Sequence, residues 1–90
     1  MKLVWRPEAL NDRNTILSYI ADRNLAAAER LAQDVADCTA RLLVTPSMYR
    51  PGRVPSTREA VIRPNYILVY RVTADAVEIV NFIHSRQRYP

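Results

Sequence analysis

The fold is decided by the stretch TREAVIRPNYILVYRVTADAVEIVNFIH, residues 57–84. It contains runs rich in β-branched and aromatic residues, and the short segments between them, Pro64-Asn65 and 73–75, have residues typical of turns. Turns this short join consecutive strands in antiparallel order. We therefore predict antiparallel strands at 57–63, 66–72 and 76–84.

Both faces of the last two predicted strands are largely apolar. Apolar residues occupy successive positions through 66–72. In 76–84, strict alternation places Ile79 and Ile83 on one face and Phe82 on the opposite face. Helices can cover only one of these faces. We therefore expect a loop, the end of the chain or a partner to cover the other.

Two amphipathic helices are predicted before these strands. A short strand at 2–6 should end at Pro7, which has no amide hydrogen for a sheet but fits the first turn of a helix. Apolar residues then recur at helical spacing, and Asn24 is the expected N-cap of a second amphipathic helix. That helix cannot continue past Thr45, because Pro46 disfavours helical geometry in the residue before it.

The predicted order is strand, helix, helix and three strands, βααβββ, in a single domain over residues 1–90. This is an α+β fold, in which a helical hairpin packs on one face of a small, mainly antiparallel sheet. A chain of this length buries only about 60% of its unfolded surface, so its core is small. A partner that covers apolar surface would add stability.

Composition excludes several classes of protein. The apolar fraction of 49% and the charged fraction of 24% are typical of a globular domain. No run approaches the roughly 18 apolar residues of a membrane span, and the N-terminus lacks the apolar core of a signal peptide, so we expect a cytoplasmic protein. One cysteine and one histidine are too few soft ligands for a structural zinc site. We expect no metal and no cofactor.

The positive charge is concentrated in the second half of the chain. Residues 1–45 hold equal numbers of basic and acidic side chains, so the whole net charge of +4 comes from residues 46–90. Nearly all basic residues are arginine, whose planar guanidinium suits bidentate contact with carboxylate or phosphate. Scattered, solvated charges are one explanation. The other is a face that binds nucleic acid or an acidic protein, with candidate residues Arg53, Arg58, Arg63, Arg71, Arg86 and Arg88.

The end of the chain brings together His84, Arg86, Arg88 and Tyr89 within a few residues. Such a set is able to cleave RNA, because arginines stabilise a pentacovalent phosphate while histidine or tyrosine transfers protons. A lone histidine at the end of a strand is more often structural, and arginines in a tail are more often solvated. These residues by themselves leave the choice open.

Three segments of the chain resemble the RelE/ParE superfamily of bacterial toxins: GRVPSTRE (52–59), YILVY (66–70) and IHSRQRYP (83–90). The resemblance extends over essentially the whole chain and is greatest to the ParE branch. It implies a toxin of a type II toxin–antitoxin module. It also implies a cognate antitoxin with an acidic, partly disordered segment that folds on the basic toxin in a hetero-oligomer.

The superfamily resemblance implies one of two activities. RelE-like members cut mRNA on the ribosome without a metal ion, and in this chain that role would fall to Arg58, His84, Arg86 and Tyr89. ParE-like members inhibit DNA gyrase and have no hydrolytic activity of their own. A binding toxin of this kind would need no catalytic residues.

Two positions of the sequence favour the gyrase inhibitor. The nuclease pattern that the chain resembles has an arginine where this chain has Ile67 and a lysine where it has Ala60. Without these cations a phosphoryl transition state lacks electrostatic stabilisation. A ribosome-dependent endoribonuclease remains the alternative, and a small nucleic-acid-binding module is a third. Against that third class, neither predicted helix carries a run of basic residues.

Overall fold

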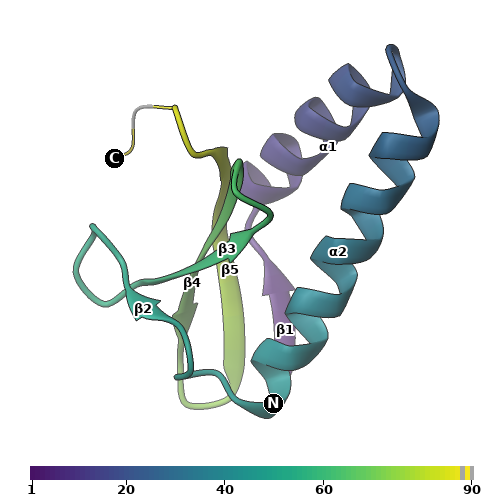
Figure 1. Ribbon diagram of the computed structural model, residues 1–90. Coiled ribbons are helices and arrows are strands. Elements are labelled where there is room, and N and C mark those ends of the chain that lie inside the picture. Colours follow the sequence, from purple (N-terminus) through teal and green to yellow (C-terminus); the bar gives the residue numbers. More distant parts are fainter. Residues whose placement is uncertain (88, 90) are drawn as a thin grey trace.

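The computed structural model describes residues 1–87 and 89, and its elements follow the predicted order (Figure 1). The α+β fold, with a helical hairpin on one face of the sheet, is confirmed. The short β2 was not predicted, because the proline-rich segment before β3 has the composition of a loop. The bounds are β1 Lys2–Trp5, α1 Pro7–Ala21, α2 Leu25–Val44, β2 Arg50–Pro51, β3 Arg58–Ile62, β4 Tyr66–Val72 and β5 Ala76–His84.

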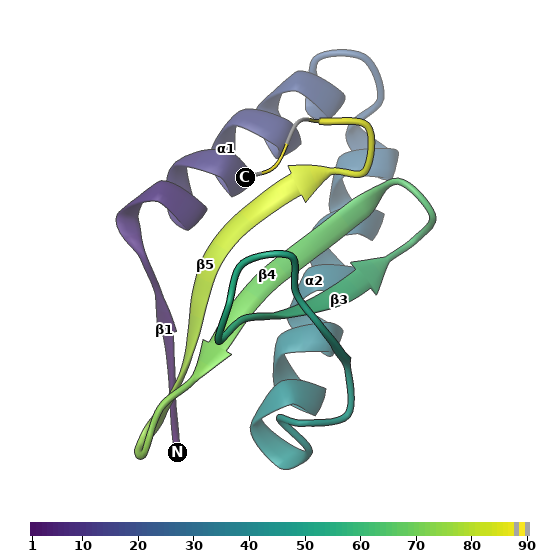
Figure 2. The same cartoon turned by 90° about the vertical axis from the view of Figure 1, so that its left-hand side faces the viewer.

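The five-stranded sheet has the order β1-β5-β4-β3-β2. The neighbours β3, β4 and β5 are antiparallel, as their short turns predicted. In contrast, β1 pairs with β5 in parallel. A parallel pair requires a long crossover connection, which begins here with the two helices. Figure 2 shows β1 beside β5, with both helices behind the sheet.

Local sequence signals fix the ends of both helices. Pro7 occupies the first turn of α1, and Oδ1 of Asn24 accepts a hydrogen bond from the backbone N–H of Ala27 at 3.0 Å. The last backbone bond of α2 runs from Thr45 N–H to Arg41 O, and Pro46 follows it. Within residues 1–87 and 89, neither helix combines the length and the hydrophobicity that crossing a bilayer requires.

A β-bulge reverses the alternation of side chains along β5. The pairing between β4 and β5 skips Val80. As a result, odd-numbered residues of β5 face the helices before Val80, and even-numbered residues face them after it. Ile79 and Phe82 both belong to the core under the helices, whereas Ile83 belongs to a separate cluster on the other face. The prediction that Ile79 and Ile83 share a face is therefore wrong, because strict alternation does not survive an extra residue.

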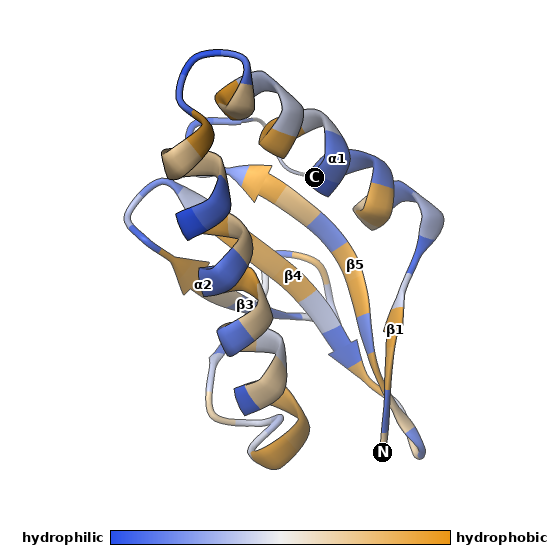
Figure 3. Ribbon diagram, turned by 90° about the vertical axis from the view of Figure 1, so that its right-hand side faces the viewer, coloured by the Kyte–Doolittle hydropathy of each residue, from blue (hydrophilic) through white to orange (hydrophobic). Residues whose placement is uncertain are grey.

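The main core lies between the helices and the sheet. Figure 3 shows the hydrophobic residues of β4 and β5 behind the two helices. Cys38, which is 1% exposed, is part of this core, and burial raises the pKa of its thiol. The uncharged thiol therefore acts as an apolar side chain. Besides the small residues Ala9 and Ala60, its best-buried members are Leu31, Val35, Cys38, Leu42, Leu68, Tyr70, Val77, Ile79 and Phe82.

A smaller cluster covers the opposite face of the sheet, which we call the second face. Ile67, Val69 and Ile83 are buried there, and Val80 and Tyr89 pack against them. Figure 1 shows the loop between β2 and β3 on this side, away from the helices. Of the three alternatives expected for this face, a loop, the chain end or a partner, the structure shows the first two, with Tyr89 packed against the cluster.

Candidate functional site

Glu59 organises the loop between β2 and β3. Its residue surface is 3% exposed, and its Oε1 accepts a hydrogen bond from Nη2 of Arg50 at 3.0 Å. Its Oε2 accepts from the backbone N–H of Arg53 at 3.1 Å and lies 3.4 Å from the Nε atom of the same arginine. A buried carboxylate needs such partners, because an unpaired buried charge is costly. Arg50 and Arg53 thus stabilise the fold by pairing with the buried carboxylate of Glu59.

The loop closes tightly at Gly52. The backbone N–H of Gly52 donates to Thr57 O at 2.8 Å, and a Cβ atom on Gly52 would lie 2.2 Å from the Thr57 hydroxyl oxygen. That hydroxyl in turn donates to Val54 O at 2.6 Å. Only glycine fits this close approach. The segment GRVPST thereby holds Arg53 in place over the second face.

Arg58 lies on the helix-facing side of the sheet, in register with Tyr70. Its Nη1 donates to the backbone carbonyl of Tyr49 at 2.7 Å, and no carboxylate pairs with it among the described residues. The Tyr70 hydroxyl donates to Pro46 O at 2.5 Å. Burial raises the pKa of Tyr70, and the positive charge of Arg58 opposes that rise. Together the two side chains hold the segment between α2 and β2 against the sheet.

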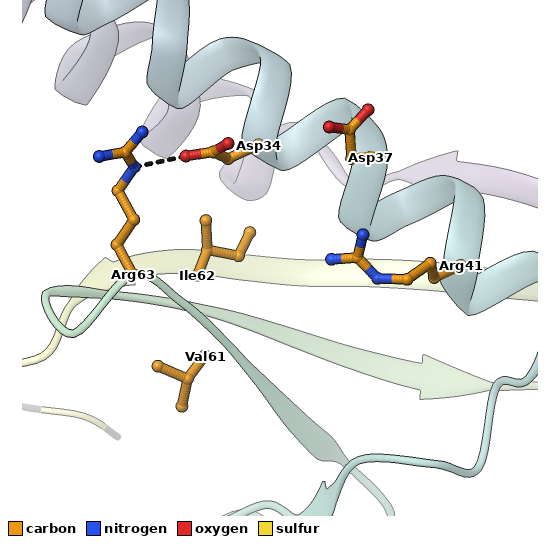
Figure 4. A pocket seen from close by; sticks show the side chains of 6 residues that line it. All are labelled: Asp34, Asp37, Arg41, Val61, Ile62 and Arg63. Atoms are coloured by element: carbon orange, nitrogen blue, oxygen red, sulfur yellow. Dashed lines mark hydrogen bonds and ion pairs between the residues drawn. The ribbon is translucent and has the colours of Figure 1, made fainter.

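Arg63 connects the β3–β4 turn to α2. Its backbone has a positive φ of 57°, and its Nε donates to the carboxylate of Asp34. Figure 4 shows this contact at one end of a polar pocket of about 280 Å³ that Asp37 and Arg41 also line. The same view shows Val61 pointing away from α2. The charges in this pocket are balanced, so Arg63 is not a free cation.

Arg71 is paired on the second face. Its Nε lies 3.5 Å from Oε1 of Glu78, and Nη1 of Arg6 donates to the same oxygen at 3.4 Å. As with Arg53 and Arg63, the carboxylate partner is distant in the sequence or on another strand. The predicted role of these arginines in partner binding stays a prediction. The structure adds that each already makes an intramolecular ion pair.

Arg86 differs from these arginines. Its side chain is exposed, and its guanidinium makes no hydrogen bond or ion pair within residues 1–87 and 89. The predicted site residue Arg88 lies outside the described residues. Nearby, the backbone carbonyl of Tyr89 accepts from Nη1 of Arg53 at 3.1 Å. Burial raises the pKa of the Tyr89 phenol, Glu59 adds to the rise, and the charge of Arg53 opposes it.

His84 lies at the other end of the sheet from Arg58. Its ring contacts the ring of Tyr66 edge-on, with 5.3 Å between centroids, and its Nδ1 accepts from the backbone N–H of Arg86 at 3.1 Å. A neutral imidazole with Nδ1 as acceptor carries its proton on Nε2. His84 and Tyr66 also line a hollow with four residues of α1. No pattern in the sequence predicts this hollow, because its walls come from three separate segments.

The four residues assigned to the nuclease alternative do not converge on one site. Arg58 pairs with Tyr70 and His84 pairs with Tyr66, and these two positions of β4 are about 13 Å apart along the strand. Tyr89 packs on the second face, while the ring of His84 lies on the helix-facing side. The two apolar positions noted in the sequence, Ala60 and Ile67, are 0% and 3% exposed and serve packing.

Comparisons with known proteins agree with this architecture. The family model described as "ParE toxin of type II toxin-antitoxin system, parDE" matches residues 3–89. The curated protein "Putative toxin Y4kP" of Sinorhizobium fredii (strain NBRC 101917 / NGR234) is 34% identical over 90 residues, which cover 99% of this chain and 93% of that protein.

Two solved structures share the fold. The chromosomal ParDE toxin–antitoxin system from P. aeruginosa superposes with a TM-score of 0.80 at 20% identity, over 93% of this chain and 95% of that one. The YoeB/ParE toxin from Agrobacterium tumefaciens superposes with a TM-score of 0.69 at 20% identity, over 99% and 100% of the two chains. Since the family model matches nearly the whole sequence and a curated relative agrees with it, this chain belongs to the family of ParE toxins of type II toxin–antitoxin systems.

Proposed function

We propose that this ParE-family toxin arrests growth by inhibiting DNA gyrase, and that it does so by binding rather than by catalysis. One observation carries the proposal: the imidazole of His84 lies on the opposite side of the sheet from Tyr89 and at the opposite end from Arg58. RNA cleavage requires proton-transfer groups and cations around a single phosphate. The positions of these side chains favour a binding protein over a nuclease.

Arg86 is the strongest candidate for a contact with the target. Arg53, Arg63 and Arg71 are paired with carboxylates, whereas the Arg86 guanidinium makes no hydrogen bond or ion pair with another described residue, and Arg86 is exposed. An exposed guanidinium offers several N–H donors in a fixed plane to an acidic surface. Arg88, next but one in the sequence, is proposed to act with it.

A cognate antitoxin is proposed to neutralise this toxin. The second half of the chain carries the whole net charge of +4, and an acidic antitoxin segment complements it. The segment would lie on the helical hairpin and on the basic sheet region, and it would order as it binds. Because the target is gyrase, the site of action would be the cytoplasm.

The test compares the two activities side by side. Purified chain is mixed with gyrase and plasmid in one assay of supercoiling, and with programmed ribosomes in another. Inhibited supercoiling and intact mRNA are expected. Arg86→Ala should weaken gyrase inhibition, because the loss of charge-assisted contacts should reduce the binding free energy to gyrase by about 1 to 3 kcal/mol. Arg30→Ala, which removes an exposed charge from α2, is the matched control and should have no effect.

His84→Gln distinguishes the alternative. Glutamine keeps hydrogen-bonding capacity but cannot act as a general acid or base near neutral pH. Gyrase inhibition is expected to stay within a few fold of the unmodified chain. Codon-specific mRNA cuts that disappear in His84→Gln, with gyrase unaffected, would replace gyrase inhibition with ribosome-dependent cleavage.

A further inference from the structure

An apolar hollow lies where the second half of α1 passes the ends of β4 and β5. Its volume is about 220 Å³, and it is lined by Thr15, Ile16, Tyr19, Ile20, Tyr66 and His84. Ile16, Ile20 and Tyr66 also pack against the main core, so its inner wall belongs to the rigid part of the fold. Tyr19, at its rim, is 61% exposed. The hollow therefore opens to solvent beside the exposed ring of Tyr19.

The size and chemistry of the hollow fit one large apolar side chain. It is smaller than the roughly 300 to 1,000 Å³ of a typical small-molecule site. Its walls are mainly apolar, and the imidazole of His84 contributes a polar group. Nδ1 of His84 is already occupied by the N–H of Arg86, which leaves Nε2–H to donate to a bound acceptor. A peptide supplies both parts, an apolar side chain and a backbone carbonyl beside it.

The charges around the hollow favour an acidic peptide. The guanidinium of Arg23 lies 3.7 Å from the centroid of the Tyr19 ring and donates to Tyr19 O at 2.9 Å. Arg86 is exposed two residues after His84. Of the nearby carboxylates, Asp12 is turned toward β5, where it accepts from the N–H of Phe82 at 3.0 Å. Asp22 is exposed beside Arg23 and offsets only part of this charge.

We propose that this hollow anchors one large apolar side chain of the antitoxin's acidic segment, and that Nε2 of His84 donates a hydrogen bond to a carbonyl of that segment. The inference rests on the proposed function only in requiring an antitoxin. It gives His84 a role in partner binding and makes Thr15, Ile16 and Tyr19 part of the antitoxin interface. The acidic residues of the segment would then lie near Arg23 and Arg86.

The experiment measures binding of the full-length protein encoded beside this chain's gene, by calorimetry. Thr15→Trp fills the hollow from its exposed mouth without touching the core. We expect affinity to fall by at least about 30-fold, the effect of losing an interface anchor. Asn11→Trp, one turn earlier on the exposed surface of α1, is the matched control and should bind as the unmodified chain does.

His84 is tested separately. His84→Ala should weaken binding by about 3- to 10-fold, as expected for one lost hydrogen bond. His84→Gln should retain most of the affinity, because the amide N–H still donates. Circular dichroism and melting temperature confirm that each variant is folded before its affinity is compared.

Each outcome decides the inference. A folded Thr15→Trp chain that binds the neighbour-encoded protein normally overturns the inference. So does an unmodified chain that does not bind that protein. Equal loss with Asn11→Trp would show that the whole helix surface, and not the hollow, is the interface. Loss of gyrase inhibition with intact antitoxin binding would assign the hollow to the target. If the unmodified chain leaves gyrase active while Thr15→Trp loses the antitoxin, gyrase inhibition fails and this inference stands.

Discussion

The two faces of the sheet are covered by different means. On the helix-facing side, Leu68, Tyr70 and Ile79 are each 0% exposed under α1 and α2. On the second face, a loop and the chain end cover a much smaller apolar cluster, and Glu59 and Arg53 hold them there. The first cover is a packed pair of regular helices. The second consists of short irregular segments fixed by charged hydrogen bonds.

This difference separates stability from adaptability. Apolar burial contributes about 25 cal/mol per Å² and is not screened by salt, so the helix-facing core should resist local opening. Ion pairs whose arginines are half exposed contribute little and are screened by salt. The second face should therefore open at lower free energy than the whole molecule unfolds. A partner that binds there would displace a weakly held cover.

The largest expected effect compares two isoleucines of one strand. Ile79→Ala should lower the free energy of unfolding by about 3 to 5 kcal/mol, because packed helices cannot collapse into the space. Ile83→Ala should cost about 2 kcal/mol, because the loop and tail over it can move inward. Urea denaturation measures both. Ile79→Val and Ile83→Val serve where an alanine variant does not fold; their costs are smaller, about 0.5 to 1.5 kcal/mol, and the cost at Ile79 should again be the larger. Equal costs on the two faces would break the comparison.

The second prediction tests the charged cover of the second face. Glu59→Gln should destabilise the chain by about 1 to 2 kcal/mol, less than a fully buried pair would, because the side chains of Arg50 and Arg53 are 55% and 42% exposed and regain water. Amide hydrogen exchange should accelerate in residues 50–57 and at the chain end.

Glu78→Gln is the control for this change. Glu78 also lies between two arginines, but it makes no hydrogen bond or ion pair with the loop or with Tyr89 among the described residues. Amide hydrogen exchange at the chain end of Glu78→Gln should match that of the unmodified chain. If Glu59→Gln leaves exchange unchanged as well, charges do not hold this cover in place.

Local signals in the sequence were sufficient for most of the fold. Pro7, Asn24 and Pro46 act on their own neighbours, so their effects on helix ends could be predicted without tertiary information. The bulge at Val80 could not, because a skipped residue leaves no compositional mark in an apolar strand. One skipped residue moved Phe82 and Ile83 to the faces opposite to those predicted.

The candidate site was less accessible from the sequence. The resemblance carried by GRVPSTRE, YILVY and IHSRQRYP gave the correct family. The partners of individual arginines depend on contacts such as Arg63 with Asp34, which are 29 residues apart. The hollow at His84 is lined by α1 and by the ends of two strands, and no spacing in the sequence predicts that these segments lie together.

The third prediction contrasts a structural arginine with an exposed one. Arg58→Ala should lower the free energy of unfolding by about 1 to 2 kcal/mol, because the backbone carbonyl of Tyr49 loses a charged, half-buried hydrogen-bond donor. Arg86→Ala should change it by less than about 0.5 kcal/mol, as for other exposed substitutions. Both variants remove one positive charge, so net charge does not explain a difference in thermal melting. Similar stability of the two would show that Arg58 is dispensable to the fold.

The smallest expected effect uses the two tyrosines with raised pKa values, one on each face. Burial raises the pKa of both Tyr70 and Tyr89. A folded-state pKa above the unfolded value of about 10 means that the folded chain holds the proton more tightly. Each tyrosine thus contributes stability that is present below about pH 10 and is lost as pH rises through its folded pKa.

The two tyrosines should nevertheless respond differently to removal of the hydroxyl. Tyr70→Phe should flatten the alkaline fall in stability, measured by urea denaturation between about pH 8 and pH 11. Tyr89→Phe should leave most of the fall in place, because the chain end can detach and ionise before the core unfolds. Cys38 also has a raised pKa and contributes with the same sign, but it is present in both variants and cancels from their difference. If Tyr89→Phe flattens the fall as much as Tyr70→Phe does, the chain end unfolds only with the core, and the two faces are equally stable.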